Sequence, residues 1–201
     1  GAAISPAVQV VVQDAQGNTV TTSTASITVA IGTNPSSGTL SGTSIVAASG
    51  GTASFSTVSL DKAGTGYTLT ATATGLTSAT STAFAVSPGA ATKLAFTVQP
   101  SAATAGAAIA PAIQVVVQDA QGNTVTTSTA NVTLAIGTNP SSGTLSGTTI
   151  VAASGGTASF STLSLDKAGA GYTLTATGTG LTSATSTAFA VSPGAATKLA
   201  F

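Results

Sequence analysis

Few side chains in this sequence could take part in acid–base, nucleophilic or metal chemistry. The charged residues are four aspartates and four lysines, and the chain contains no His, Cys, Glu or Arg. Catalysis by a Ser or Thr hydroxyl needs a base beside it, and an imidazole is the usual base near neutral pH. We therefore predict that the protein is not an enzyme and that it carries no cofactor.

One acidic motif, Asp-Ala-Gln-Gly-Asn, occurs twice, at 14–18 and at 119–123. A carboxylate there could bind Ca²⁺, which needs several clustered oxygen ligands. Neither motif has a second carboxylate nearby in the sequence, so we prefer a structural turn in which Asp caps backbone amides and Gly supplies a positive φ. The predicted turn residues are Asp14, Gly17, Asn18, Asp119, Gly122 and Asn123, and no metal ligand is predicted.

Two further residue types could involve carbohydrate. Tyr67 and Tyr172 could stack on sugar rings, although such a tyrosine more often packs its ring in the core and hydrogen-bonds its hydroxyl. Threonines at alternate positions could accept O-glycans, or could be present because Thr suits exposed strand faces. These threonines are Thr68, Thr70, Thr72, Thr173, Thr175 and Thr177.

The composition also limits the partners. With no Arg and only four scattered lysines, the chain lacks the basic patch that binding to nucleic acid requires. No apolar run approaches the roughly 18 residues of a membrane span. We therefore expect neither nucleic acid nor a membrane span among its interactions.

Period-two alternation of apolar side chains predicts the strands that position these residues. Clusters of Gly, Asn, Asp and Pro separate the alternating segments, as expected for an all-β fold of tandem immunoglobulin-like β-sandwiches with about seven strands per repeat. The alternation changes phase between Phe160 and Leu165, which predicts a bulge or kink near Ser161. The clearest alternating segments are 93–98, 113–118, 132–136, 172–176 and 189–191.

The sequence repeats itself with a period of 105 residues. Residues 1–96 align with 106–201 without a gap and differ at nine positions. Ser-Pro-Gly at 87–89 and again at 192–194 gives the strongest break between two strands. We therefore predict three segments, which are a repeat lacking its first strand (1–88), a complete repeat (89–193) and the first strand of a following repeat (194–201).

Several motifs resemble the bacterial immunoglobulin-like repeats of invasin and intimin. Val-Gln-Asp-Ala-Gln-Gly-Asn-Thr-Val at 12–20 and 117–125 is similar to their recurrent Asp/Gly-Asn motif, and Lys93-Leu94-Ala95-Phe96 is similar to their first strand. Thr19 and Thr124 stand where these repeats often have Pro. The resemblance implies an immunoglobulin-like fold and a place in a large exported surface protein.

These observations favour a structural extracellular protein, a segment of a cell-surface fibre, stalk or filament built from head-to-tail units. A ligand-binding adhesin or a carbohydrate-binding module is the alternative. Binding surfaces usually depend on anchors such as Trp, Arg or clustered Tyr, and the chain has no Trp, no Arg and two Tyr. The expected location is extracellular or at the cell surface.

The expected partners are neighbouring identical repeats and copies of the chain itself. The first repeat lacks counterparts of Leu94 and Phe96, each worth about 1.5–3 kcal/mol of burial, against a total stability of about 5–15 kcal/mol for a domain. Two explanations remain open. The chain is a window on a longer polypeptide, or Lys198, Leu199 and Phe201 belong to an inter-unit or inter-chain strand that completes the first repeat of another copy.

Overall fold

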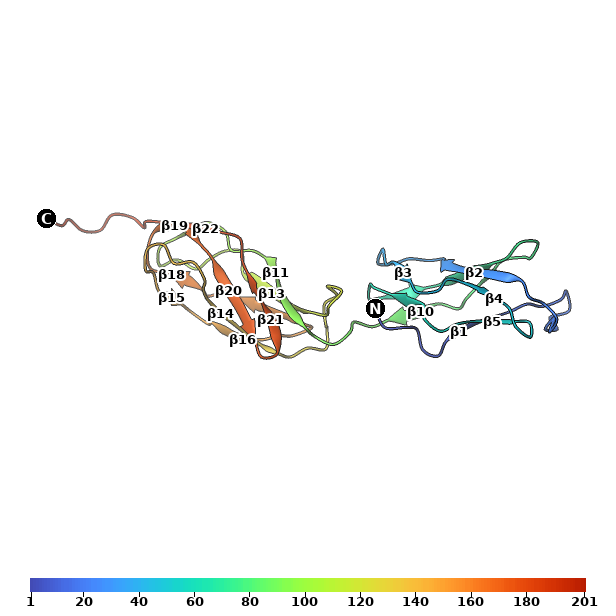
Figure 1. Cartoon of the computed structure of the whole chain (residues 1–201). Helices are drawn as coiled ribbons and strands as arrows, with labels where there is room; N and C mark the ends of the chain where they lie inside the picture. Colours follow the sequence, from blue (N-terminus) through green and yellow to red (C-terminus); the bar gives the residue numbers. More distant parts are fainter. The chain divides into compact units, whose positions relative to one another are not determined.

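The chain consists of β-strands and turns in this computed structural model, which describes residues 1–201. It divides into two compact units, Gly1–Gly89 and Ala90–Phe201 (Figure 1). The prediction of an all-β, immunoglobulin-like fold is confirmed. None of its segments forms a helix of the length and hydrophobicity that a membrane crossing would need.

The second unit has three sheets. The largest joins seven strands in the order β16-β14-β20-β21-β11-β13-β17, and the others have the orders β12-β22-β19 and β15-β18. The strands are β11 (Lys93–Val98), β12 (Ala103–Thr104), β13 (Ile113–Gln118), β14 (Asn131–Ile136), β15 (Leu145–Ser146), β16 (Ile150–Ala152), β17 (Thr157–Phe160), β18 (Ser164–Leu165), β19 (Gly169–Tyr172), β20 (Leu174–Gly178), β21 (Leu181–Thr185) and β22 (Phe189–Ser192).

Strand β11 connects the two halves of the largest sheet. It runs antiparallel to β13 over its length, and Lys93 pairs in parallel with Thr182 of β21. Two further backbone bonds extend the contact, from Thr92 N to Gln118 O at 2.8 Å and from Thr182 N to Thr92 O at 2.9 Å. Without β11, the pair β13-β17 would be separated from the other four strands of this sheet.

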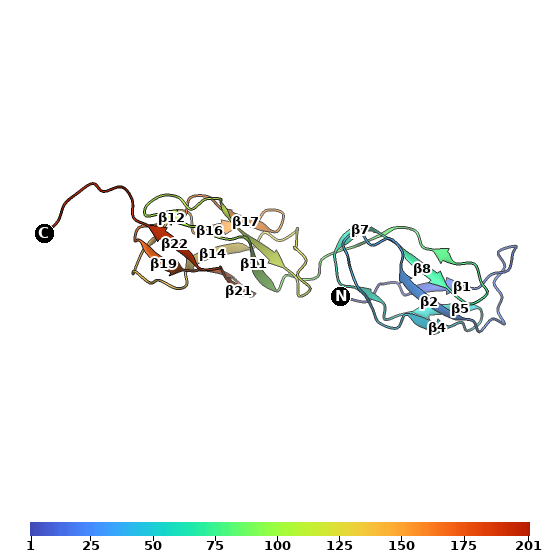
Figure 2. The ribbon, with the colours of Figure 1, turned by 90° about the horizontal axis from the view of Figure 1, so that it is seen from above.

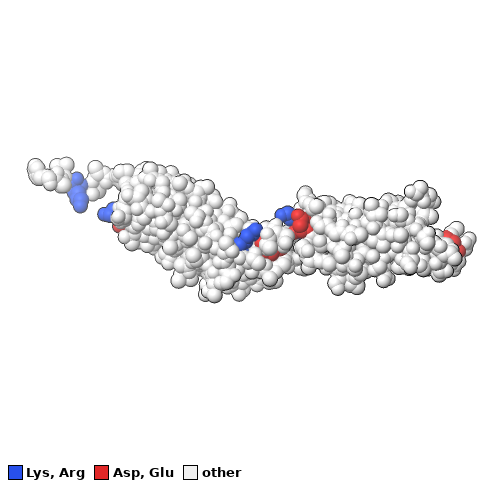
Figure 3. All heavy atoms as spheres, viewed as in Figure 1, with Lys and Arg blue, Asp and Glu red and all other residues white.

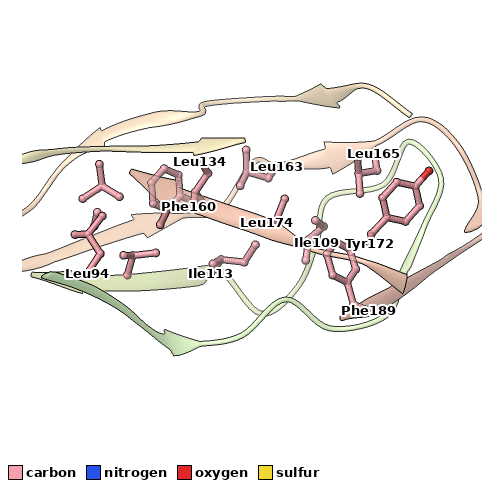
Figure 4. Packing of buried hydrophobic residues seen from close by; sticks show 14 of the residues in the cluster. Leu94, Ile109, Ile113, Leu134, Phe160, Leu163, Leu165, Tyr172, Leu174 and Phe189 are labelled. Atoms are coloured by element: carbon pink, nitrogen blue, oxygen red, sulfur yellow. The ribbon is translucent and has the colours of Figure 1, made fainter. Parts of the chain in front are cut away.

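The core of the second unit lies between its sheets (Figure 4). The alternation in the sequence accounts for it, since Val132 and Leu134 of β14 are buried while the residues between and beside them are not. Leu94 points into this core from β11 and is 4% exposed. The rings of Tyr172 and Phe189 lie with their centroids 6.1 Å apart.

The predicted change of phase between Phe160 and Leu165 marks a change of sheet. Strand β17 ends at Phe160 and pairs with β13, whereas β18 begins at Ser164 and pairs with β15. Phe160, Leu163 and Leu165 are all buried. The backbone is closely packed where the chain changes sheet. A Cβ on Gly147 (φ +99°) would collide with the carbonyl oxygen of Thr162.

The first unit repeats this architecture without counterparts of β11 and β12 (Figure 2). Its sheets have the orders β4-β2-β8-β9, β1-β5, β10-β7 and β3-β6. The registers agree, since Val8 pairs with Phe55 as Ile113 pairs with Phe160. The strands are β1 (Val8–Val11), β2 (Ser26–Ile31), β3 (Leu40–Ser41), β4 (Ile45–Ala47), β5 (Thr52–Phe55), β6 (Ser59–Leu60), β7 (Gly64–Tyr67), β8 (Leu69–Thr72), β9 (Ala79–Thr80) and β10 (Phe84–Val86).

The strand count exceeds the seven expected per repeat, because several strands are only two residues long. Strands β15 and β18 each have two residues. Strand β21 (Leu181–Thr185) was missed because its Thr, Ser and Ala residues give no apolar alternation. With these additions the strands of the second unit fall into three hydrogen-bonded sheets.

Candidate functional site

The recurrent Asp motifs form closed turns in which the carboxylate is already bonded. Asn123 donates its backbone N–H to Oδ1 of Asp119 and its side-chain amide to Oδ2, both at 2.8 Å. Gly122, at φ +82°, allows the chain to reverse. No group of three or more acidic or other metal-ligating side chains occurs in the chain. The geometry is that of a side-chain-capped turn.

The first copy of the turn has the same bonds in a different environment. Oδ1 of Asp14 accepts from the backbone N–H of Gln16 (3.0 Å) and of Asn18 (2.8 Å), and Oδ2 accepts from the Asn18 side chain (3.0 Å). The Asn18 side chain, followed by its backbone N–H, lowers the pKa of the Asp14 carboxyl. Asp14 is exposed whereas Asp119 is 1% exposed, so the two turns differ in burial at identical sequence.

The tyrosines are buried within the sandwiches. Tyr172 has no exposed surface, and its hydroxyl donates to the Lys167 carbonyl at 3.0 Å. Tyr67 makes the same bond to Lys62 at 3.0 Å. Each tyrosine ends a strand rather than starting one, β19 and β7 respectively. Their rings therefore offer no surface on which a sugar could stack.

The threonine rows are less exposed than the sequence suggested. Thr173 and Thr175 are half-buried, and a Cβ on Gly137 would lie 2.7 Å from the hydroxyl oxygen of either residue. The Thr173 hydroxyl oxygen also accepts from the backbone N–H of Thr138 at 2.7 Å. Thr177 is exposed at the end of the row. O-glycosylation stays a prediction, with Thr177 the most accessible of these three hydroxyls.

The largest difference between the units lies where β11 would be in the first unit. There, β1 and β9 have no strand between them, and a hollow of about 380 Å³ remains. A second hollow of about 270 Å³ lies along the same strands and shares Val10, Val11, Ala71 and Ala79 with the first. We call this surface, bounded by β1, β8 and β9, the edge groove.

Burial at equivalent positions confirms that the missing strand leaves the groove open. Val11 is 42% exposed, whereas its counterpart Val116 is 5% exposed. Ala71 is half-buried, whereas Ala176 is fully buried. The edge strands are also shorter, because β9 has two residues where β21 has five. The first unit therefore exposes apolar side chains and strand edges. In the second unit, β11 covers the equivalent groups.

The residues of the edge groove were missed as a site by the sequence reasoning. A signal was present, since Val10, Val11 and Val12 are three successive apolar residues in a segment that otherwise alternates. Such a run is typical of a strand covered on both faces. A strand with one exposed face would need apolar residues only at alternate positions.

The segment proposed as an inter-unit strand is fully exposed in the single chain. Residues 194–201 form no strand and extend from the end of β22 (Figure 1). Leu199 is 99% exposed, in contrast to 4% for its counterpart Leu94. Residues 197–201 have the same sequence as Thr92–Phe96 of the β11 segment. The roles of Lys198, Leu199 and Phe201 stay predictions.

Charged side chains are rare over the surface of both units (Figure 3). The Asp61 carboxylate accepts a hydrogen bond from the backbone N–H of Thr39 at 2.6 Å, and this bond lowers the pKa of Asp61. Asp166 accepts from Thr144 in the same way at 2.6 Å. These carboxylates stabilise loops.

Parts of several solved bacterial proteins match the chain at low sequence identity. The adhesin InvE of Yersinia pseudotuberculosis matches 92% of this chain and 53% of its own, with 18% identity and a TM-score of 0.41. The bacterial integrin-binding protein invasin matches 92% of this chain and 35% of its own, with 20% identity and a TM-score of 0.34. The predicted resemblance is confirmed at the level of the fold. No protein-family profile and no curated protein sequence matches the chain.

One comparison corrects a prediction. A β-glycosidase from Bacteroides vulgatus matches 80% of this chain with 15% identity and a TM-score of 0.43, and the chain covers 20% of that enzyme. The prediction that the protein is not an enzyme is therefore wrong as it was drawn. It rested on the side chains of these 201 residues alone.

Proposed function

We propose that the chain is a structural repeat of an extracellular or cell-surface protein, in which immunoglobulin-like units follow one another head to tail along a fibre, stalk or filament. The observation that carries the proposal is the 105-residue repeat, each copy of which folds around a core of its own. Units that fold separately can be added in series without changing one another's cores. The sequence resemblance to invasin and intimin repeats supports the surface location.

The exposed side chains support a structural role over a ligand-binding one. Energetic anchors of binding surfaces are mostly Trp, Tyr and Arg. Both tyrosines are buried, and Phe201 is the only exposed large aromatic residue. Ile45 and Ile150, at equivalent positions of the two units, are exposed aliphatic residues. These features favour a surface that repeats along a series of units.

The location is tested with antibodies raised against the purified chain. We expect them to label intact, unpermeabilised cells or the extracellular material around them, and we expect protease treatment of intact cells to remove the label. Electron micrographs of the labelled material should show extended structures that carry the label at many places. Labelling that requires permeabilised cells would contradict the extracellular role.

The adhesin alternative is separated from the structural role by direct binding. The purified chain, immobilised at high density, should capture no glycan from an array above the level of a scrambled-loop control. Reproducible capture of one glycan class, lost on substitution of exposed residues, would replace the structural proposal with the carbohydrate-binding one.

A further inference from the structure

The second unit brings two segments that are far apart in the sequence together in the same direction. Strand β11 pairs in parallel with β21, and β12 pairs in parallel with β22. Figure 2 shows β11 beside β21 at one end of the unit and β12 beside β22 at the other. We call residues 92–105 the entry segment, residues 181–192 the exit segment, and their pairing the parallel clamp.

Backbone hydrogen bonds join the two segments at both ends of the parallel clamp. At one end, Thr182 donates its N–H to the Thr92 carbonyl at 2.9 Å. At the other end, Ala105 donates its N–H to the Ser192 carbonyl at 2.8 Å, next to the paired strands β12 and β22. The start of the entry segment therefore lies beside the start of the exit segment, and their ends also lie together.

A side chain provides a third connection in the middle of the parallel clamp, where the two segments are not paired as strands. Oε1 of Gln99 accepts from the backbone N–H of Thr187 at 3.0 Å and from the Thr187 hydroxyl at 3.4 Å. Gln99 follows β11, and Thr187 lies between β21 and β22. The two residues are 88 positions apart in the sequence, so this bond links the entry and exit segments directly.

The parallel direction decides how these connections respond to tension along the chain. The chain enters the clamp at Thr92 and leaves it at Ser192, and these two residues lie at opposite ends of the clamp. Tension therefore slides one segment along the other, and all three connections resist the movement at the same time. If the segments were antiparallel, the chain would enter and leave at the same end, and tension would open the connections one after another.

Neighbouring strands and the core keep the two segments in place. On its other side β11 pairs with β13, and β22 pairs with β19. Leu94 of the entry segment and Val191 of the exit segment are both buried in the core of the unit. Sliding of either segment would therefore also bring apolar side chains into contact with water, which is unfavourable.

We propose that the parallel clamp is the part of the repeat that carries tension along the chain. The proposal rests on the proposed function, because a fibre or stalk of units in series is pulled along its length. It goes beyond that function, since it names the hydrogen bonds that must break before the sandwich opens. The test uses the purified chain alone.

The experiment pulls single molecules of the 201-residue chain between pairs of introduced cysteines. The chain has no Cys, so the introduced thiols are its only attachment points. Ala90→Cys with Ala195→Cys pulls the two segments past each other. Ala107→Cys with Ala195→Cys places both attachment points at the same end of the clamp, which opens the same bonds in sequence. All three alanines are exposed and lie outside the strands.

The unit should withstand a clearly higher force when it is pulled between residues 90 and 195 than between 107 and 195 at the same speed. The released length shows which unit has opened, because each freed residue extends by at most about 3.3–3.6 Å. An equal force in the two directions overturns the proposal, because resistance would then depend on the stability of the fold and not on the direction of the clamp.

The middle connection is tested by Gln99→Ala, a change at an exposed residue. Forced unfolding is governed by the unfolding rate. At constant force between residues 90 and 195, the variant should unfold about fivefold faster, the factor expected for one lost hydrogen bond. Between 107 and 195 the increase should be smaller, because the connections break one by one.

Thr185→Ala is the matched control for this substitution. Thr185 is exposed on β21 and its hydroxyl makes no hydrogen bond, so the unfolding rate under force should stay unchanged. An unchanged rate in Gln99→Ala, or an equal increase in both pulling directions, overturns the proposal. Neither result would affect the surface location measured on cells.

Discussion

Substitution of one leucine in two identical sequence contexts tests whether the first strand stabilises its unit. Leu94 is 4% exposed and Leu199 is 99% exposed, yet both lie in Thr-Lys-Leu-Ala-Phe. Leu94→Ala should destabilise the second unit by about 2–5 kcal/mol, the usual range for a buried leucine. Leu199→Ala should change the stability of the unit by no more than about 0.5 kcal/mol.

The assay is pulse-labelling hydrogen exchange in urea, read by mass spectrometry at a concentration where the chain is monomeric. Peptides from the two units are distinguished because Leu163 replaces Val58. For a slope of about 2 kcal/mol per M of urea, Leu94→Ala should lower the midpoint of the second unit by about 1–2.5 M and leave that of the first unit unchanged. Equal, small effects of both substitutions would show that β11 contributes nothing to its sandwich.

Three further substitutions test single contacts. Tyr172→Phe removes the bond to the Lys167 carbonyl and should cost the second unit about 1 kcal/mol in urea unfolding; no loss would mean that water replaces the hydroxyl. Gly147→Ala should cost clearly more than Gly155→Ala, because both have positive φ but only Gly147 meets backbone atoms; equal costs in the same assay would refute the close contact. Asn18→Ala should raise the pKa of Asp14 towards its ordinary value, measured by NMR titration of the carboxyl carbon, because the Asn18 side chain is the largest cause of the lowered value; the stabilisation by this turn is present above about pH 4 and is lost as the pH falls through the lowered pKa, so an unchanged titration midpoint would contradict the assignment.

The sequence predicted the fold because its strands alternate regularly. Val132 and Leu134, two residues apart, are both buried. The short strands were not predicted, since two residues such as Leu145–Ser146 carry no period. The spacing of Phe160 and Leu165 correctly predicted an interruption of the strand. It did not show that the chain changes sheet there, because a bulge and a change of sheet shift the alternation in the same way.

The candidate surface could be predicted only in part. The second copy of Thr92–Phe96, at residues 197–201, was evident from the repeat. The groove was not, because its existence depends on which edges of the sandwich meet at β11, and pairing partners cannot be read from a local pattern. Val11 and Val116 are the same residue type in the same local sequence, yet Val11 is exposed and Val116 is buried.

The two units allow nearly identical sequences to be compared within one chain. At 87 of the 96 aligned positions the residues are identical, and β11 pairs with β13 in the second unit. A difference between Val11 and Val116 in amide exchange therefore reports mainly whether a strand pairs along that edge. A single spectrum of the unmodified monomer would measure how far the influence of one strand extends through a β-sandwich.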